Sequence, residues 1–388
     1  MASDNKVAIE GRLLWPGGEI KQGFLVSDEA GRISIISEGP LPEAHRSNSR
    51  VLQLSQDHIA VPGYIDVQIN GGFGEEVKSN PTAVATLRTR MPKFGVTSFM
   101  PTITSLPIEA YAEVLANIHQ QAPGAGSEVL GVHLEGPFLN KTMRGGHPQD
   151  YLAIPSAVNE KDFANDSLVR MVTLAPELDG ALPLIERLAT RGIVVGVGHS
   201  CADEKTLQEA LTHGLQWGTH IFNAMNPIKG RELGLAGYLL TERKLTAGII
   251  VDGIHVHPRM ALLTYQMKGS DSLILMTDSS AVTGLSPGTY DFRNRQITTD
   301  GVSARLPDGT LVGSILTLDR AVRNMIAFTG CSLADAVHMA SAGPAQLVGM
   351  HKRKGILAVG ADADVAILDA AFEVVATVVQ GRVAYEST

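Results

Sequence analysis

The sequence has very few cysteines: Cys201 and Cys331 are the only two among its 388 residues. Two thiols cannot form a disulfide framework, and such scarcity is typical of a protein in a reducing cytosol. The sequence also lacks an apolar run of about 18 residues, the length needed to cross a membrane. The stretch from Met1 to Gly11 is polar, unlike a secretory signal. We therefore predict a cytoplasmic protein without a membrane span.

Positive charge is also scarce. The chain has 32 Lys and Arg residues against 40 Asp and Glu residues, which gives a formal net charge of -8. Nucleic acids and anionic membranes are therefore not expected as partners, because both carry negative charge themselves. A small anionic substrate remains possible where cations gather locally.

Hydrophobic residues are plentiful at 44%, enough for a large core. The length suits either two ordinary domains or one barrel of about 250 residues with an accessory domain. In the middle of the chain, apolar strand-like runs alternate with helix-like segments, a pattern typical of parallel α/β architecture. We count eight such strands, which end near Asn70, Pro101, Glu135, Pro176, His199, Phe222, Asp252 and Asp278.

Eight strands predict a (β/α)8 TIM barrel over residues 59–345. A doubly wound open sheet is the alternative, but it would not gather polar residues at so many strand ends. Residues 1–58 and 346–388 contain short strand-like runs separated by turns, and chain termini often lie close together. We expect these two segments to form one small β-sandwich, and we expect an inserted hairpin over Tyr290 to Leu311.

The segment from Ile193 to Met225 carries the first sign of a metal site. His199 stands at the end of one predicted strand, and His220 lies in the next, with a helix capped by Asp203 between them. Adjacent parallel strands lie about 4.8 Å apart, so the two imidazoles can converge at one end of the sheet. Zinc and ferrous iron both bind imidazole.

Glu135 ends the third predicted strand and can complete this ligand set. Two histidines, one carboxylate and a water form a common catalytic zinc arrangement. His133 points to the same face one layer deeper, where we expect a packed or supporting residue.

Polar residues after other strands suggest further roles. Asp278 can exchange protons with a metal-activated water, although an aspartate at this place can also cap a helix. The NGGFG stretch from Asn70 allows close backbone approach to an anion, and an ordinary turn needs the same glycines. His255 and His257 can serve as metal ligands or as an anion clamp. Lys229, Arg231 and His255 bring positive charge near the predicted mouth of the barrel.

Taken together, these motifs resemble the N-acetylglucosamine-6-phosphate deacetylases of the amidohydrolase superfamily. The resemblance extends over nearly the whole chain and rests on PGYIDVQINGGFG from Pro62, GVTSFMPT from Gly95, HLEGPFL from His133, GHS from Gly198, THIFNAM from Thr219, DGIHVHP from Asp252 and TDS from Thr277. It implies a barrel with a flanking β-sandwich built from both termini, and a homodimer.

The resemblance also implies individual roles. Glu135, His199 and His220 would bind the metal, Asp278 would be the general base and acid, and His147 would polarise the amide carbonyl. Gln68 and Asn70 occupy the places of a His-x-His pair found in many amidohydrolases, so one divalent metal per chain is expected: zinc first, with iron or another ion as alternatives. The substrate-binding candidates are Asn223, Ala224, His255, Gln68, Asn70 and, from the neighbouring subunit, Arg231.

The implied reaction is hydrolysis of the acetamide of N-acetyl-D-glucosamine 6-phosphate to D-glucosamine 6-phosphate and acetate, in amino-sugar metabolism. Amide hydrolysis needs a strong nucleophile at neutral pH, and a metal can lower the pKa of bound water from about 15.7 towards 7. One alternative is an epimeric substrate such as N-acetylgalactosamine 6-phosphate. Another is a non-catalytic amidohydrolase-like scaffold, which the joint retention of the ligands and Asp278 disfavours.

Overall fold

Eight parallel strands form the central sheet of the computed structural model, which describes residues 6–159, 163–292 and 295–387. The strands follow one another around the sheet in chain order, and the short strand β10 (Glu128–Val129) also pairs with the second of them. They are β6 (Tyr64–Ile69), β9 (Val96–Thr104), β11 (Val132–Glu135), β12 (Val169–Leu174), β13 (Val194–Val197), β14 (Leu215–Gly218), β15 (Thr246–Ile249) and β16 (Leu273–Leu275). The predicted eight-stranded barrel is confirmed.

The sheet closes through the segment that follows β16. Ile69 and Ser279 form a parallel bridge, and the Asn70 backbone N–H donates to the Ser279 carbonyl at 3.0 Å. Most strand residues are buried, as expected for parallel strands covered on both faces. Inside the sheet, the buried Trp217 of β14 lies between Gly196 of β13 and Gly248 of β15, because only glycine leaves room for the indole there.

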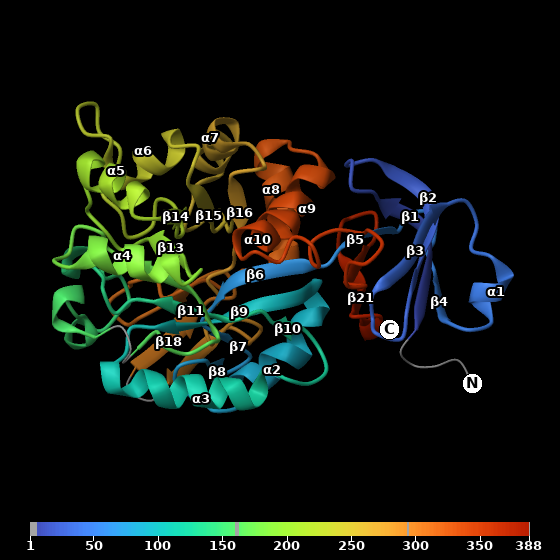
Figure 1. Cartoon of the computed structure of the whole chain (residues 1–388), viewed down its shortest axis with the longest axis horizontal. Coiled ribbons are helices and arrows are strands. Elements are labelled where there is room, and N and C mark those ends of the chain that lie inside the picture. Colours follow the sequence, from blue (N-terminus) through green and yellow to red (C-terminus); the bar gives the residue numbers. More distant parts are fainter. Residues whose placement is uncertain (1–5, 160–162, 293–294, 388) are drawn as a thin grey trace.

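Helices cover the outside of the barrel (Figure 1). The connection from β11 to β12 differs from the others, because its described residues contain short 3-10 helices and no α-helix. The α-helices around the barrel are α2 (Ala83–Arg90), α3 (Tyr111–Gln121), α4 (Ala181–Thr190), α5 (Glu204–Thr212), α6 (Gly234–Thr241), α7 (Pro258–Lys268), α8 (Leu318–Thr329), α9 (Leu333–Ala340) and α10 (Ala342–Leu347). The 3-10 helices are η1 (Met91–Phe94), η2 (Ile108–Ala110), η3 (Lys141–Met143), η4 (Gln149–Tyr151) and η5 (Pro155–Ala157).

Strands from both ends of the chain form a second unit beside the barrel, at the right of Figure 1. In place of two separate sheets, they make one mixed eight-stranded sheet. Its strands are β1 (Val7–Leu14), β2 (Ile20–Ser27), β3 (Ile33–Glu38), β4 (Arg50–Gln53), β5 (Ile59–Pro62), β20 (Val365–Leu368), β21 (Val374–Val379) and β22 (Arg382–Glu386). β5 lies beyond residue 58 but belongs to this sheet, because it pairs with both β1 and β20. The short helix α1 (Glu43–Arg46) precedes β4.

A small three-stranded sheet follows the last barrel strand, where the hairpin is predicted. It consists of β17 (Gly288–Phe292), β18 (Arg295–Thr299) and β19 (Ala304–Arg305), and residues 293–294 lie outside the described part. A two-stranded ribbon, β7 (Gly71–Gly72) and β8 (Glu75–Glu76), follows β6. Among the described residues, no helix is both long and apolar enough to span a membrane.

Candidate active site

Polar side chains from several strand ends meet at one end of the barrel. Glu135 is the last residue of β11, whereas His199, His220 and Asp278 follow the ends of β13, β14 and β16. The strand before His220 ends at Gly218, earlier than the predicted end near Phe222, because the backbone turns sharply at His220. His199, His220 and Asp278 have φ values of 50°, 36° and 49°, and Ala224 has 50°. Non-glycine residues rarely adopt this left-handed region, and such strain concentrates at functional sites.

Glu135, His199 and His220 bring three ligand atoms together. The two Nε2 atoms of His199 and His220 lie 3.1 Å apart, and they lie 3.4 and 3.0 Å from Glu135 Oε1. Zinc at about 2.0 to 2.1 Å from each ligand in a tetrahedral site would separate neighbouring ligand atoms by about 3.3 Å. The three buried side chains therefore have the spacing of a divalent metal site.

The hydrogen bond of His199 prepares its ring for this role. Its Nδ1 lies 2.7 Å from the carbonyl oxygen of Met143, so Nδ1–H donates and the lone pair of Nε2 faces Glu135 and His220. His220 Nδ1 is buried and has no partner among the described residues. Burial disfavours a charged ring, yet the hydrogen bond with Glu135 and the negative charges of Glu135 and Asp278 together outweigh burial and raise the pKa of His220. The same carboxylate would favour a cation held between the two rings.

Glu135 and Asp278 are both buried carboxylates, but their pKa values move apart. Burial raises the pKa of Glu135, and the hydrogen bonds from His147, His199 and His220 outweigh it, so that its pKa falls well below the ordinary value. Burial and the nearby charge of Glu135 together raise the pKa of Asp278. When the pKa values of two carboxylates in one site move in opposite directions, the two groups usually have different chemical roles.

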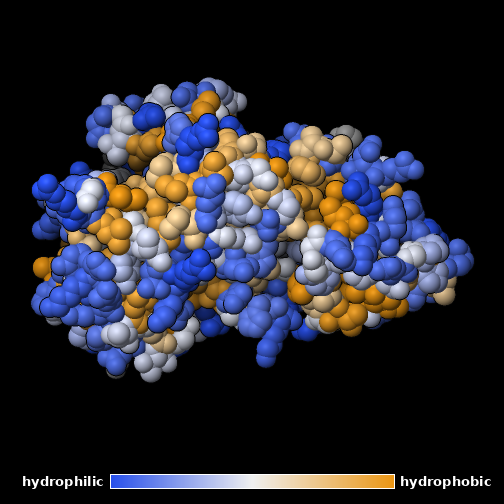
Figure 2. Space-filling model, turned by 90° about the horizontal axis from the view of Figure 1, so that it is seen from above, coloured by the Kyte–Doolittle hydropathy of each residue, from blue (hydrophilic) through white to orange (hydrophobic). Residues whose placement is uncertain are grey.

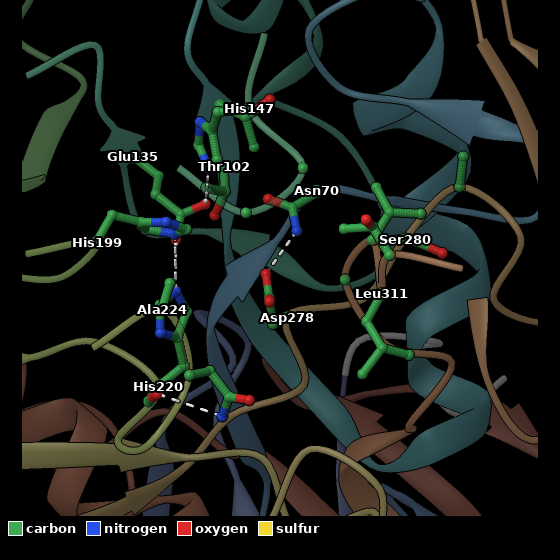
Figure 3. Close-up of a pocket in the computed structure, with 18 of the residues that line it drawn as sticks. Asn70, Thr102, Glu135, His147, His199, His220, Ala224, Asp278, Ser280 and Leu311 are labelled. Atoms are coloured by element: carbon green, nitrogen blue, oxygen red, sulfur yellow. Dashed lines mark hydrogen bonds and ion pairs between the residues drawn. The ribbon is translucent and has the colours of Figure 1, made fainter. Parts of the chain in front are cut away.

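Two amides hold Asp278 in place. Asn70 Nδ2 donates to Asp278 Oδ1 at 2.6 Å, and Gln68 Nε2 donates to both Asp278 Oδ1 at 3.0 Å and Glu135 Oε1 at 2.8 Å. Figure 3 shows the Asn70 side chain pointing at the Asp278 carboxylate. Asn70 lines the pocket, whereas Gln68 is fully buried beneath it.

His147 comes from the long loop after β11 and faces Glu135 from the other side. Its Nδ1 accepts from the Ser105 backbone N–H at 3.3 Å, so its proton resides on Nε2, which lies 3.4 Å from Glu135 Oε2. Burial lowers the pKa of His147 to about 4. The ring is therefore neutral near pH 7 and presents one N–H donor to the pocket.

The remaining predicted substrate residues occupy different places. Asn223, Ala224 and His255 line the same pocket as Glu135, His199 and His220. His255 Nδ1 lies 2.6 Å from Asp252 Oδ2, which orients the ring. Arg231 is exposed on the loop before α6 and does not line the pocket of its own chain.

Other candidates have structural roles. His257 caps α7 by accepting from the Arg259 backbone N–H, and unlike His255 it does not line the pocket. Lys229 is exposed and pairs with Glu232 at 2.7 Å. His133 is fully buried, with hydrogen bonds to Val67 O and Thr173 Oγ1, which agrees with the supporting place expected for it.

Several pocket residues escaped the sequence analysis. Lys78 lines the pocket beside Thr102 and Thr104, and Arg295 reaches in from the inserted sheet to pair with Glu76. A lysine soon after the NGGFG turn could have drawn attention to Lys78. No local pattern marks Arg295, because its pocket position depends on how the inserted sheet folds over the barrel.

Comparison with known proteins supports the architecture and the family. The model of the amidohydrolase family matches residues 59–384. The N-acetylglucosamine-6-phosphate deacetylase of Bacillus subtilis is 35% identical over 376 residues, which cover 95% of this chain and 94% of that protein. The Bos taurus enzyme of the same name is 40% identical, with 84% of each chain covered.

The chain is also similar to solved structures of proteins with the same name. The N-acetylglucosamine-6-phosphate deacetylase of Pasteurella multocida has a TM-score of 0.89 at 28% identity, covering 97% of this chain and 99% of its own. A mutant of the Mycobacterium smegmatis enzyme, solved with N-acetyl-D-glucosamine-6-phosphate, has a TM-score of 0.86 at 30% identity over 99% of both chains. The chain belongs to the N-acetylglucosamine-6-phosphate deacetylases of the amidohydrolase family.

Proposed function

We infer that this protein hydrolyses the acetamide of N-acetyl-D-glucosamine 6-phosphate to D-glucosamine 6-phosphate and acetate. The observation that carries this inference is the group of Glu135, His199 and His220 beside Asp278 in one pocket of a chain from this family. A close relative was solved with the same sugar phosphate.

We propose that Glu135, His199 and His220 hold one divalent metal, with zinc as the first candidate. Two nitrogens and one carboxylate oxygen at this spacing suit zinc, and other divalent ions accept the same donors. Such a metal lowers the pKa of water from about 15.7 towards 7 and polarises a carbonyl oxygen. Gln68 and Asn70 present amide N–H groups where a second set of ligands would stand, which favours a single metal.

The side chains around these ligands supply the proton transfers. Ionised Asp278 takes a proton from the attacking water and later gives it to the departing amine of the sugar. His147 donates from Nε2 to the amide carbonyl oxygen, where negative charge develops. The neutral state of His147 and its Ser105 hydrogen bond keep that donor correctly oriented.

The sugar phosphate would lie at the opposite side of the pocket, against His255, Asn223 and Ala224. We propose that Arg231 of the partner subunit in a homodimer completes this phosphate site. In its own chain Arg231 is exposed, and its neighbours Ile228 and Leu233 are 45% and 36% exposed, as expected for a surface that another subunit covers. The two free cysteines favour a cytoplasmic location.

Acetate release from N-acetyl-D-glucosamine 6-phosphate, measured before and after chelation and after zinc is restored, tests the proposal. We expect release by the metal-loaded protein, loss after chelation and recovery with zinc. N-Acetylgalactosamine 6-phosphate, assayed in parallel, tests the epimeric alternative. Absence of acetate from the metal-loaded protein would disprove the proposed reaction, and full activity without metal would disprove the metal mechanism.

A further inference from the structure

Lys78 is a charged side chain in the pocket for which the proposed reaction has no use. It lies shortly after β8, and its side chain is only 11% exposed. Its Nζ donates to Thr104 Oγ1 at 2.9 Å, and the nearest carboxylate oxygen, Glu76 Oε1, is 4.0 Å away. An ammonium group has three donors, so two of them have no hydrogen-bond acceptor among the described residues.

Glu76 cannot fully neutralise Lys78, because it also pairs with Arg295 and accepts from Ser79 Oγ at 2.6 Å. Two cations therefore share one carboxylate at this wall of the pocket. Burial disfavours the charged amine and lowers the pKa of Lys78 to about 8. A buried ammonium with an incomplete set of partners is costly unless a ligand supplies an acceptor.

The position of Lys78 relates it to one part of the substrate. Figure 3 shows His147 and Thr102 on one side of Glu135, with Ala224 and His220 on the other. The proposed function places the phosphate against Ala224 and His255, and the amide carbonyl beside His147. Because an amide is planar and usually trans, the acyl chain leads away from the sugar and past His147. Lys78 lies on this side of the pocket: Thr104, which accepts from its Nζ, is the neighbour of Glu135 on the adjacent strand, and the charge of Lys78 is close enough to lower the pKa of His147.

We propose that Lys78 forms the end of an acyl subsite that selects short N-acyl groups ending in a carboxylate, in addition to acetyl. This inference rests on the proposed function, because it uses the same metal ligands and the same sugar phosphate. For an N-malonyl substrate, water adds to the acyl carbon, the C–N bond breaks, and the amine nitrogen receives the proton. The products are malonate and D-glucosamine 6-phosphate, and no other reactant is required.

A matched pair of substrates tests the subsite. N-Malonyl- and N-isovaleryl-glucosamine 6-phosphate have acyl groups of similar shape that end in a carboxylate or in an isopropyl group. We expect kcat/KM of the wild-type enzyme to favour malonyl by at least about tenfold, the effect of one charged hydrogen bond. Lys78→Met should bring the ratio of the two kcat/KM values, malonyl over isovaleryl, close to 1. Lys78→Arg should keep a preference for malonyl.

Lys268→Met is the control for removal of a buried lysine. Lys268 lies outside the pocket and donates to the carbonyls of Glu242 and Leu245 at 2.7 and 2.6 Å, so this variant should keep the wild-type ratio. Thermal unfolding of each variant checks that it is folded, and Lys78→Arg provides the test if Lys78→Met does not fold.

Acetate release from N-acetyl-D-glucosamine 6-phosphate, measured on the same preparations, separates the two proposals. If the wild type releases acetate but shows no preference for malonyl over isovaleryl, the acyl subsite is wrong and the proposed function stands. If Lys78→Met lowers kcat/KM for both acyl groups by the same factor, Lys78 serves the phosphate or the fold, and the acyl subsite is again wrong. Without acetate release, the proposed function itself fails.

Discussion

At the scale of single residues, the site depends on two carboxylates that titrate in opposite directions. The three histidines around Glu135 hold it ionised, which suits a metal ligand. Asp278 has its pKa raised by burial and by the charge of Glu135, which suits a group that gains and loses a proton in each turnover. Neither shift can be derived from an aspartate or glutamate in the sequence alone.

Asp278→Asn should lower turnover by about 10² to 10⁴, because the amide keeps the shape of the side chain but cannot accept a proton. Only ionised Asp278 acts as a base, so wild-type activity should rise with pH through its pKa, at a higher pH than for an ordinary aspartate. Asp291→Asn, outside the pocket, is the matched control. Kinetics against pH and metal analysis provide the measurements. If Asp278→Asn loses its metal, Asp278 is chiefly a metal ligand. If Asp278→Asn keeps normal turnover, another group carries the proton.

The purified protein should retain one divalent metal per chain after dialysis. Three ligand atoms meet at Glu135, whereas the amides of Gln68 and Asn70 donate hydrogen bonds where further ligands would be needed. Elemental analysis measures the number of metal ions per chain. Two equivalents that resist dialysis would contradict the single site.

At the scale of secondary-structure elements, the spacing of neighbouring strands depends on which side chains fill the barrel. Trp217 of β14 is fully buried, and a Cβ atom added to Gly248 would lie 2.5 Å from its ring and 2.4 Å from Met276 Sδ. The indole thus occupies the volume that glycine leaves free on β15. The strand ends above it carry the proposed metal ligands, so this packing also positions the site.

Gly248→Ala should lower the free energy of unfolding by about 1 to 3 kcal/mol, the usual cost of overpacking a core. Gly17→Ala is the control, because a Cβ at Gly17 would meet no atom within 4 Å. Urea denaturation followed by circular dichroism compares the two variants with the wild type. Equal stability of both would mean that the barrel relaxes around the added methyl group.

At the scale of the whole molecule, a buried ion cluster joins the barrel to the sheet formed by the termini. Lys354 Nζ lies 2.5 Å from Glu128 of β10, 2.8 Å from Asp362 and 2.6 Å from Asp364, and the lysine side chain is only 1% exposed. These residues come from both units, so the cluster ties their relative positions together. Removal of this lysine would leave Asp364 buried without a counter-ion, whereas Glu128 and Asp362 would keep only Arg353.

Lys354→Met should therefore destabilise the protein by about 3 to 5 kcal/mol. Lys205→Met is the control, since Lys205 is 84% exposed and its change should stay within about 0.5 kcal/mol. Denaturant midpoints and slopes of both variants provide the comparison. A cost below about 1 kcal/mol for Lys354→Met would show that water or rearrangement compensates the acidic groups.

The dimer proposal also belongs to this scale. Arg231→Ala should weaken binding of the phosphorylated sugar by about 1.5 to 3 kcal/mol, the contribution of a charged hydrogen bond. Hydrophobic residues are visible in the middle of the molecular face in Figure 2, the side on which Figure 1 places α6 and α7. In the proposed homodimer, we expect the partner subunit to cover part of this face.

Mixed dimers of an Arg231→Ala chain with an Asp278→Asn chain test whether Arg231 acts across the interface. If it does, one of the two sites combines an intact Asp278 with an intact Arg231, and activity is partly restored. Verified mixed dimers without any restored activity would contradict a shared site.

The sequence by itself determined the class of fold and the group of candidate metal ligands. Apolar runs such as Val194 to Val197 identify buried parallel strands without reference to the rest of the chain. Polar residues at the carboxyl ends of parallel strands lie at the same end of the barrel, so the sequence alone groups Glu135, His199, His220 and Asp278.

The tertiary structure decided what depends on contacts between distant segments. β5 belongs to the terminal sheet because β20, some 300 residues later in the chain, pairs with it. Glu76, Lys78 and Arg295 line one wall of the pocket, although Arg295 lies 219 positions after Glu76, with which it pairs. The proton positions on His147 and His199 depend on Ser105 and Met143 in the same way. Local patterns register burial and periodicity, whereas these contacts depend on how loops fold over the barrel, which no single stretch of sequence encodes.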